Sequence, residues 1–348
     1  MLKRGIIGAL ILAAGCLGTS CREQDSLRLP SEKHLRNIRQ LTFGGENAEA
    51  YFSFAFDKLV FQSTRDSFAC DQIYSMGLDG TNLKLLSTGF GRTTCSYFLP
   101  GDSTIIYATT HLRDPQCPPR PDYSKGYIWA VYKSYDLVLA TAGGTILRPL
   151  TTTDGYDAEA TVSPSGGRIV FTSVRDGDLD LYSMNADGSD VKRLTSETGY
   201  DGGAFYSPDG NQIVYRSHHP TDSTAIAEYK ALLKDGFVRP TKMEICTMNA
   251  DGSDKRVITR LGAGSFAPFY HPDGKHIIFA SNYKDPKGRN FDLFMIGTDG
   301  EGLEQITFND TFDGFPMFDK NGSQLVFASN RHSSQKGETN IFIAEWVP

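Results

Sequence analysis

The sequence predicts an all-β protein, a six-bladed β-propeller over residues 34–348. Three observations predict this fold: a repeat of about 45 residues, short apolar runs bounded by turns, and a composition that favours strands. The 348 residues include 35 Gly, 22 Phe and 16 Tyr but only 2 Trp. Such a composition is typical of strands joined by tight turns rather than of helices.

The repeat is visible as closely similar segments. Residues 155–173 align with residues 199–217 without a gap, and YSMNADGSDVKRLT (182–195) resembles CTMNADGSDKRVIT (246–259). An apolar residue before Thr or Ser closes each unit, at Leu41, Leu86, Leu150, Leu194, Ile258 and Ile306. The intervals are 45, 64, 44, 64 and 48 residues. The shorter ones fit the four strands of a propeller blade.

Each unit is predicted to contain four strands in a fixed order. In one unit the first strand covers Ala204–Ser207, and the second covers Gln212–Arg216 after a Pro-Asp-Gly turn. The glycine of this turn accepts the positive φ that the hairpin needs. In the preceding unit the third strand covers Asp180–Met184, and an Asp-Gly turn leads to the fourth strand, which ends at the apolar anchor.

The order of the units also predicts how the ring closes. A fourth-type strand near Asn37–Thr42 precedes every first-type strand, and the last unit stops after its third strand, Asn340–Trp346. Pairing the N-terminal strand with the C-terminal blade completes six blades and removes the exposed sheet edge that an open array would leave.

These motifs resemble the TolB-like β-propeller repeat family. Its signature appears here as Leu-Thr at 194–195, Ser-Pro-Asp-Gly at 207–210, Ser-Val-Arg at 173–175 and Asp-Gly at 187–188. The resemblance covers residues 34–348 and implies the propeller fold, but one scaffold hosts many functions. TolB itself carries a further N-terminal α/β domain, for which this sequence has no room.

The N-terminus is typical of an export signal. Lys3 and Arg4 precede an apolar run over residues 6–14, which is too short to span a bilayer. The following Ala-Ala-Gly-Cys resembles the lipobox of bacterial lipoproteins, with Cys16 as the lipidated residue and Cys21 as the alternative.

We therefore expect a lipoprotein-type signal peptide over residues 1–20, cleaved before Cys16 or Cys21, and a flexible tether over residues 22–33. A plain secretory signal is the alternative. No Asp follows either cysteine, which in lipoproteins favours the outer membrane. The expected location is the bacterial cell envelope, as an outer-membrane-anchored lipoprotein or a periplasmic protein.

Export permits disulfide bonds. By the repeat alignment, Cys95 lies on an innermost strand, and Cys70 and Cys117 lie in neighbouring loops of the same face. A disulfide among these three is expected, and the pairing is left open.

The two long intervals place insertions over residues 110–134 and 218–243, in blades 2 and 4. Both lie between the second and third strands, so the propeller carries them on one face. The first arm contains Tyr123, Tyr127, Trp129, Tyr132 and Tyr135. These aromatic residues form either a binding platform or a local core. The second arm predicts an amphipathic helix from an N-cap at Ser223 to Gly236, acting as a lid or as a partner-binding element.

Candidate ligand-binding residues gather on the same face. They are His111, Asp157, Glu159, Asp201, Arg216, His218 and Arg331. One interpretation is a ring of acids and imidazoles that binds a polar ligand or a divalent cation at the channel mouth. The alternative is structural: an Asp before each strand caps a turn, and the Arg of the Ser-x-Arg loop pairs with it.

Composition and missing motifs limit the function. A net charge of −6 argues against nucleic-acid binding. The sequence has no G-x-S-x-G, H-E-x-x-H or G-x-x-x-x-G-K motif. We favour a lipid-anchored, non-catalytic interaction or ligand-binding module that needs no cofactor. Its expected partner is an envelope protein or peptide docked on the face with the arms, with membrane contact only through the lipid. The alternative is a lyase- or hydrolase-like enzyme, or a metal or small-ligand receptor, with its site at the channel mouth.

Overall fold

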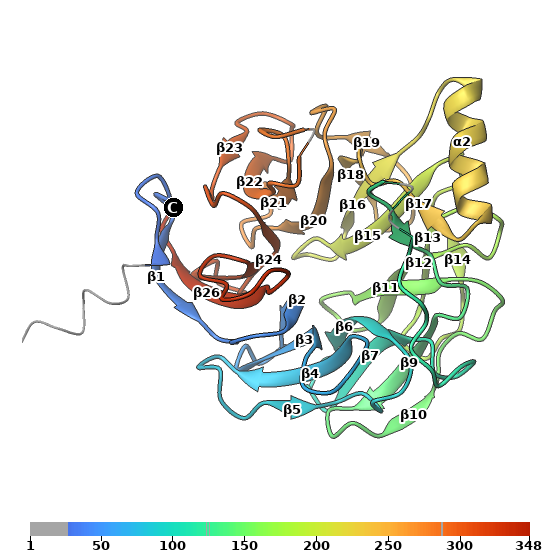
Figure 1. Ribbon diagram of the computed structural model, residues 1–348. Coiled ribbons are helices and arrows are strands. Elements are labelled where there is room, and N and C mark those ends of the chain that lie inside the picture. The colour runs from blue at the N-terminus through green and yellow to red at the C-terminus, as the bar shows by residue number, and fades with distance from the viewer. Residues whose placement is uncertain (1–26, 123, 125, 287) are drawn as a thin grey trace, which may run out of the picture.

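Six four-stranded antiparallel sheets stand around a central axis (Figure 1). The computed structural model describes residues 27–122, 124, 126–286 and 288–348. The expected signal peptide, with Cys16 and Cys21, and residues 22–26 of the expected tether lie outside the described residues, as does Tyr123. Among the described residues, no helix has the length and apolar character needed to cross a membrane.

Five blades are formed by consecutive stretches of the chain. They are blade 1 with β2 (Glu46–Phe52), β3 (Lys58–Thr64), β4 (Gln72–Gly77) and β5 (Lys84–Leu85); blade 2 with β6 (Thr93–Phe98), β7 (Thr104–Thr109), β9 (Asp136–Thr141) and β10 (Ile146–Pro149); blade 3 with β11 (Asp157–Val162), β12 (Arg168–Ser173), β13 (Asp180–Asn185) and β14 (Lys192–Arg193); blade 4 with β15 (Tyr200–Tyr206), β16 (Gln212–His218), β18 (Glu244–Asn249) and β19 (Arg256–Val257); and blade 5 with β20 (Ser265–Tyr270), β21 (His276–Ser281), β22 (Asp292–Gly297) and β23 (Glu304–Gln305).

Blade 6 joins the two ends of the described chain. It consists of β24 (Asp313–Phe318), β25 (Gln324–Ser329), β26 (Asn340–Trp346) and the N-terminal strand β1 (Leu35–Gln40). β1 pairs with β26, with Leu35 opposite Trp346. The predicted closure of a six-bladed ring is confirmed.

Every innermost strand carries a β-bulge at the same position. The register of each shifts there, and one residue has a φ between 50° and 59°. These bulge residues are Glu49, Cys95, Glu159, Gly203, Ala267 and Phe315. All six line the narrow part of the central channel, because a bulge redirects the side chain that it carries.

Aromatic rings pack across the channel beyond the bulge residues. Phe205 contacts Tyr51 and Phe269 edge-to-face, each at 5.4 Å between ring centroids, and Tyr97 at 6.2 Å. Only about 20 Å³ of free space remains between these rings and the bulge residues. A ligand therefore reaches the bulge residues from the opposite side, where the two arms lie.

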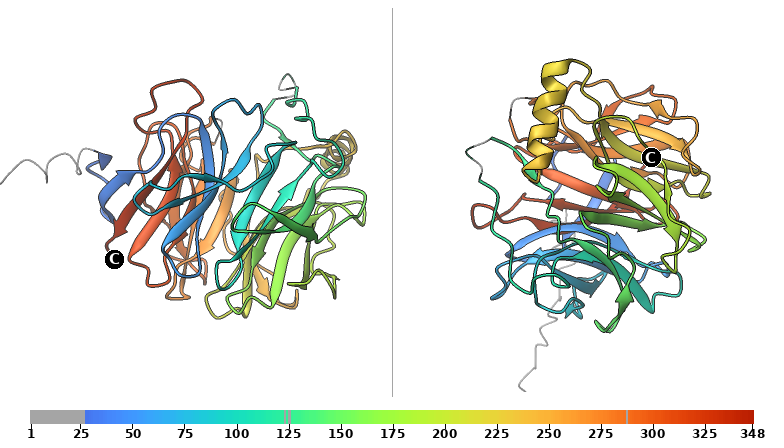
Figure 2. Two further views of the ribbon diagram at one scale, coloured as in Figure 1. Left: turned by 90° about the horizontal axis from the view of Figure 1, so that it is seen from below. Right: turned by 90° about the vertical axis from the view of Figure 1, so that its right-hand side faces the viewer.

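The two arms pair with each other on one face of the propeller (Figure 2). β8 (Trp129–Ala130) in the first arm and β17 (Phe237–Val238) in the second form an antiparallel pair, with Trp129 opposite Val238. They share a small core with blades 3 and 4 that includes Val131, Leu179 and Met243.

The second arm contains α2 (Ser223–Lys234), which lies at the outer edge of the propeller beside blades 3 and 4 (Figure 1). Its N-cap is Asp222, not the expected Ser223, since the Asp222 carboxylate accepts a hydrogen bond from the Ala225 amide at 2.8 Å. Tyr229 is the buried residue of the helix. Its hydroxyl lies within hydrogen-bond distance of the Asp178 carboxylate and of the Gly199 carbonyl.

A disulfide fixes the first arm to blade 1. Cys70 and Cys117 are bonded, with 5.8 Å between their Cα atoms, whereas Cys95 and Cys246 are buried free thiols. The structure thus selects one of the three pairings that the sequence left open. The first arm is held to blade 1 by this bond and to the second arm by β8 and β17.

Part of the expected flexible tether is instead packed against blade 6. Glu32 is fully buried, and its carboxylate pairs with the Arg331 guanidinium at 2.8 Å. Arg331 also pairs with Asp313 at 2.9 Å and donates to the Leu27 carbonyl at 3.1 Å. A buried arginine with two carboxylate partners therefore fixes residues 27–33, which the sequence analysis expected to be flexible.

A candidate ligand-binding pocket at the channel mouth

A pocket of about 390 Å³ lies between the first arm and the central channel. Its floor contains the bulge residues Glu49 and Glu159 together with Arg216, and the first arm covers it with Tyr127, Trp129 and Tyr132. The side walls are aromatic: Tyr135, Tyr156, Phe266, Phe312 and Phe315. The aromatic residues of the first arm thus form a wall of the pocket as well as part of a local core.

Glu159 and Arg216 form a buried ion pair at the floor. Glu159 also accepts hydrogen bonds from the Thr172 hydroxyl at 2.8 Å and the Gly203 amide at 3.0 Å. The Arg216 guanidinium lies over the Trp129 ring, 5.0 Å from its centroid. Burial alone would lower the pKa of Arg216, but the effect of Glu159 and Tyr200 is larger, and the net pKa is raised. The guanidinium therefore stays charged. Arg216 therefore connects a channel carboxylate to the arm that covers it.

Glu49 is the second acid of the floor, and the sequence analysis missed it. One of its carboxylate oxygens, Oε2, is buried and has no hydrogen-bond partner. The pKa of Glu49 is raised to about 7: burial is the largest cause, a hydrogen bond from the Cys95 thiol acts in the opposite direction, and the charge of Glu159 adds to the rise. Glu49 occupies the same place in blade 1 as Glu159 in blade 3, so the alignment of those two repeats contained the signal that identifies it.

Arginine–carboxylate pairs surround this floor. Arg92 pairs with Asp71, and Asp71 also accepts from the Thr64 hydroxyl at 2.5 Å. At the exposed rim, Arg120 lies 3.8 Å from Glu46. Among the described residues that line the pocket, each arginine has its own carboxylate, and Glu49 has no ion-pair partner.

Three of the predicted site residues belong to structural pairs within single blades. Asp157 pairs with Arg175 at 3.0 Å, and Asp201 lies 3.2 Å from His219. Arg331 pairs with Asp313 in the corresponding position of blade 6. All three aspartates are fully buried. In each case an Asp at the start of the first strand pairs with a side chain of the loop after the second strand, as the structural interpretation expected. None of these residues lines the pocket.

The two predicted histidines also lie outside the pocket. His111 Nδ1 is 2.7 Å from the Thr109 hydroxyl within its own loop. His218 ends β16, and burial lowers its pKa. The pocket therefore brings together Glu159 and Arg216 of the seven predicted residues and adds Glu49 and the aromatic walls.

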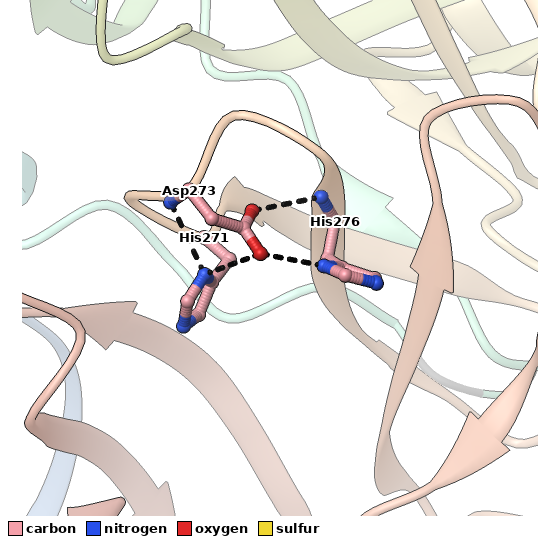
Figure 3. Close-up of side chains that lie close together, drawn as sticks. All are labelled: His271, Asp273 and His276. Carbon is pink, nitrogen blue, oxygen red and sulfur yellow. Dashed lines mark hydrogen bonds and ion pairs between the residues drawn. The ribbon is translucent and has the colours of Figure 1, made fainter. Parts of the chain in front are cut away.

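Metal-ligating groups converge elsewhere in the described part of the chain. His271, Asp273 and His276 form one such group on the hairpin between β20 and β21 (Figure 3), and Glu197, Asp201 and His219 form another. Asp273 accepts from the Lys275 amide at 2.7 Å and lies 3.1 and 2.7 Å from Nδ1 of His271 and His276. These bonds account for the hairpin as an Asp-capped turn. Neither group lines the channel-mouth pocket.

Comparison with known families agrees with this architecture. Residues 131–238, from the end of the first arm to β17, match the family model described as the TolB beta propeller domain. Over this segment the chain is similar to the TolB β-propeller family. No curated protein sequence matches it.

Solved structures with this fold have diverse roles. This chain shares 18% identity and a TM-score of 0.57 with a protein from Agrobacterium tumefaciens assigned as TolB, over 89% of this chain and 97% of the other. A gluconolactonase from Xanthomonas campestris matches with 14% identity and a TM-score of 0.57, over 90% of both chains. An oligogalacturonate lyase in complex with manganese matches with 15% identity and a TM-score of 0.50, over 89% and 93%. At these identities the likeness is one of fold.

Proposed function

We propose that this TolB-like propeller is an exported, lipid-anchored binding module of the bacterial cell envelope that holds a ligand in the channel-mouth pocket. The paired arms are the observation that carries the proposal. Two insertions from different blades are joined by β8 and β17, and the disulfide and Tyr229 fix them to the body of the propeller. A roof tied at three places keeps a polar-floored pocket preformed, which lowers the entropic cost of binding.

The chemistry of the pocket favours binding over catalysis. Its described lining contains no histidine, serine or lysine. The Cys95 thiol beside it is buried, and burial raises its pKa well above the ordinary value, which makes it a poor nucleophile. Of the described lining residues, Glu49 has its pKa raised to about 7, mainly by burial. An enzymatic role would therefore draw first on Glu49 as an acid or base.

A divalent cation such as the manganese of the lyase does not fit this floor. Divalent ions need several converging donors. Here the carboxylate of Glu159 is already engaged by Arg216, so Glu49 is the one carboxylate of the floor without an ion-pair partner among the described residues. The aromatic walls supply no ligand atoms. We therefore derive no step that uses a metal.

The two tryptophans allow a direct test of binding. Trp129 lies in the pocket, whereas Trp346 lies in blade 6 against Phe318. In a Trp346→Phe variant, the emission of Trp129 is expected to change with amino acids, amines, dipeptides or small sugars tested as separate classes. Trp129→Phe is the matched control and should show no such change. If no class alters Trp129 emission, a preformed ligand pocket is ruled out.

The lipid anchor is tested separately in cells. Metabolic labelling with radioactive palmitate should label the protein and lose at least 90% of the signal in the Cys16→Ser variant. Label lost only in Cys21→Ser would move the anchor to the second cysteine. Label retained in both single variants and in the double variant would contradict lipidation at this N-terminus.

A further inference from the structure

We infer that the pocket selects a ligand with an organic cationic group, a protonated amine or a quaternary ammonium, held against the carboxylate of Glu49. The inference rests on the proposed function and names the class of ligand for that same pocket. It is carried by the unpartnered Glu49 oxygen, by the pairing of the other charges of the pocket, and by the aromatic walls.

The charges of the pocket leave one position open. Arg216, Arg92 and Arg120 are matched with Glu159, Asp71 and Glu46. Glu49 adds a carboxylate without a counterion, and its Oε2 is buried without a hydrogen-bond donor. A buried acceptor left unsatisfied is unfavourable. A ligand that supplies a positively charged N–H or ammonium group satisfies this oxygen and neutralises the pocket.

The walls above Glu49 are suited to a cation. Ring faces attract cations through their quadrupole, most strongly where water is excluded. Two walls already hold guanidinium groups of the protein: Arg216 lies 5.0 Å from the Trp129 centroid and Arg289 lies 4.9 Å from that of Tyr127. Phe266, Phe312 and Phe315 add apolar surface for the carbon part of an amine. A volume of about 390 Å³ suits a small organic molecule rather than a bare ion.

Protonation of Glu49 gives the inference a pH signature. The groups that act on Glu49 come from the surrounding blades: Cys95, Glu159, Arg216 and Asp71. Because burial raises the pKa of Glu49 to about 7, the carboxyl is neutral in acid and charged in mild alkali. A cation prefers the charged form, so binding lowers this pKa and releases a proton. Affinity should fall by up to tenfold for each pH unit below 7.

The experiment compares probes matched in shape but not in charge. Full-length protein with Trp346→Phe is titrated with choline and putrescine, with their neutral counterparts 3,3-dimethylbutanol and 1,4-butanediol, with succinate and with Mn²⁺. Trp129 emission and calorimetry report binding at pH 8 and pH 5.5. The two cations should bind at least tenfold more tightly than their neutral counterparts at pH 8 and lose tenfold or more at pH 5.5.

Two variants test the role of Glu49. Glu49→Gln should reduce cation affinity at least tenfold and remove its dependence on pH. Glu301→Gln, which changes an exposed carboxylate on the turn before β23 and outside the pocket, should leave the affinity within twofold. Circular dichroism before and after thermal unfolding checks that both variants are folded.

The outcomes separate this inference from the proposed function. If neutral probes or succinate bind as tightly as the cations, the pocket stands and the cationic selectivity is wrong. If Mn²⁺ binds more tightly and the binding is lost in Glu49→Gln, the site is a metal site and the inference is overturned. If neither these probes nor the broader classes alter Trp129 emission, the inference and the binding function fail together.

Discussion

Removal of β1 is expected to unfold the entire propeller. A protein that begins at Phe43 lacks the strand that pairs with β26, and with it the fully buried side chains Leu35 and Ile38. The ring then has a three-stranded sixth blade in which the edge of β26 is exposed, and an exposed edge promotes aggregation. We expect insoluble protein, or soluble protein without a cooperative thermal transition by circular dichroism.

The matched control begins at Leu27 and keeps both β1 and Glu32. It should be monomeric by size-exclusion chromatography and unfold in one cooperative transition, at a temperature within a few degrees of the full-length protein. A cooperative transition in the shorter protein at that same temperature would mean that ring closure contributes little to stability.

Replacement of Arg331 by Met is expected to have the next largest effect. It leaves the buried carboxylates of Glu32 and Asp313 without a counterion, next to Asp292, whose pKa burial and Asp313 already raise to about 7. Removing one partner of a buried ionic network costs about 3–5 kcal/mol of unfolding free energy. Urea denaturation at pH 8 measures it.

The pH dependence and a second variant identify the cause. Carboxyl groups that are buried without a counterion have folded-state pKa values above their unfolded values, so the loss should be smaller at pH 5 than at pH 8. Glu32→Gln in the Arg331→Met background should restore part of the stability.

Arg175→Met is the matched control in blade 3. It leaves one carboxylate, Asp157, and should cost less, about 1.5–3 kcal/mol. Equal losses in the two variants would contradict a special role for Glu32.

The repeat predicted most of the fold because every blade obeys the same local rules. The turn motifs and the apolar anchors predicted the number of blades, the closure of the ring and the bounds of the strand Asn340–Trp346. The inner strand expected over Ala204–Ser207 begins earlier and covers Tyr200–Tyr206. The N-terminal strand lies two residues earlier than expected, over Leu35–Gln40 instead of Asn37–Thr42. Strand ends are set by individual hydrogen bonds that a repeat pattern does not specify.

The repeat pattern does not predict the contacts between the two insertions, because the insertions are not part of the repeat. β8 and β17 have two residues each and lie about a hundred residues apart in the chain, so neither shows a periodic pattern. The segment over residues 22–33 looked like a tether because it is polar. Burial of Glu32 depends on Arg331, 299 residues further along the chain.

The site was partly predictable for the same reason. Repeat position identified Glu159 as a channel residue, and Glu49 follows from the same alignment. The repeat position did not show which carboxylates face the channel axis, as Glu159 does, and which pair with an arginine of their own blade, as Asp157 does. That difference depends on a bulge only two residues further along each inner strand.

The bulges have a consequence for how such a protein can change. Each holds a residue in a left-handed conformation that favours glycine, yet here the six positions carry two glutamates, a cysteine, an alanine, a phenylalanine and one glycine. The surrounding ladders hold this backbone conformation at five positions that are not glycine, whereas a Cβ at Gly203 would clash with the Arg216 guanidinium. The lining of the axis can therefore be changed one blade at a time by point substitutions at those five positions.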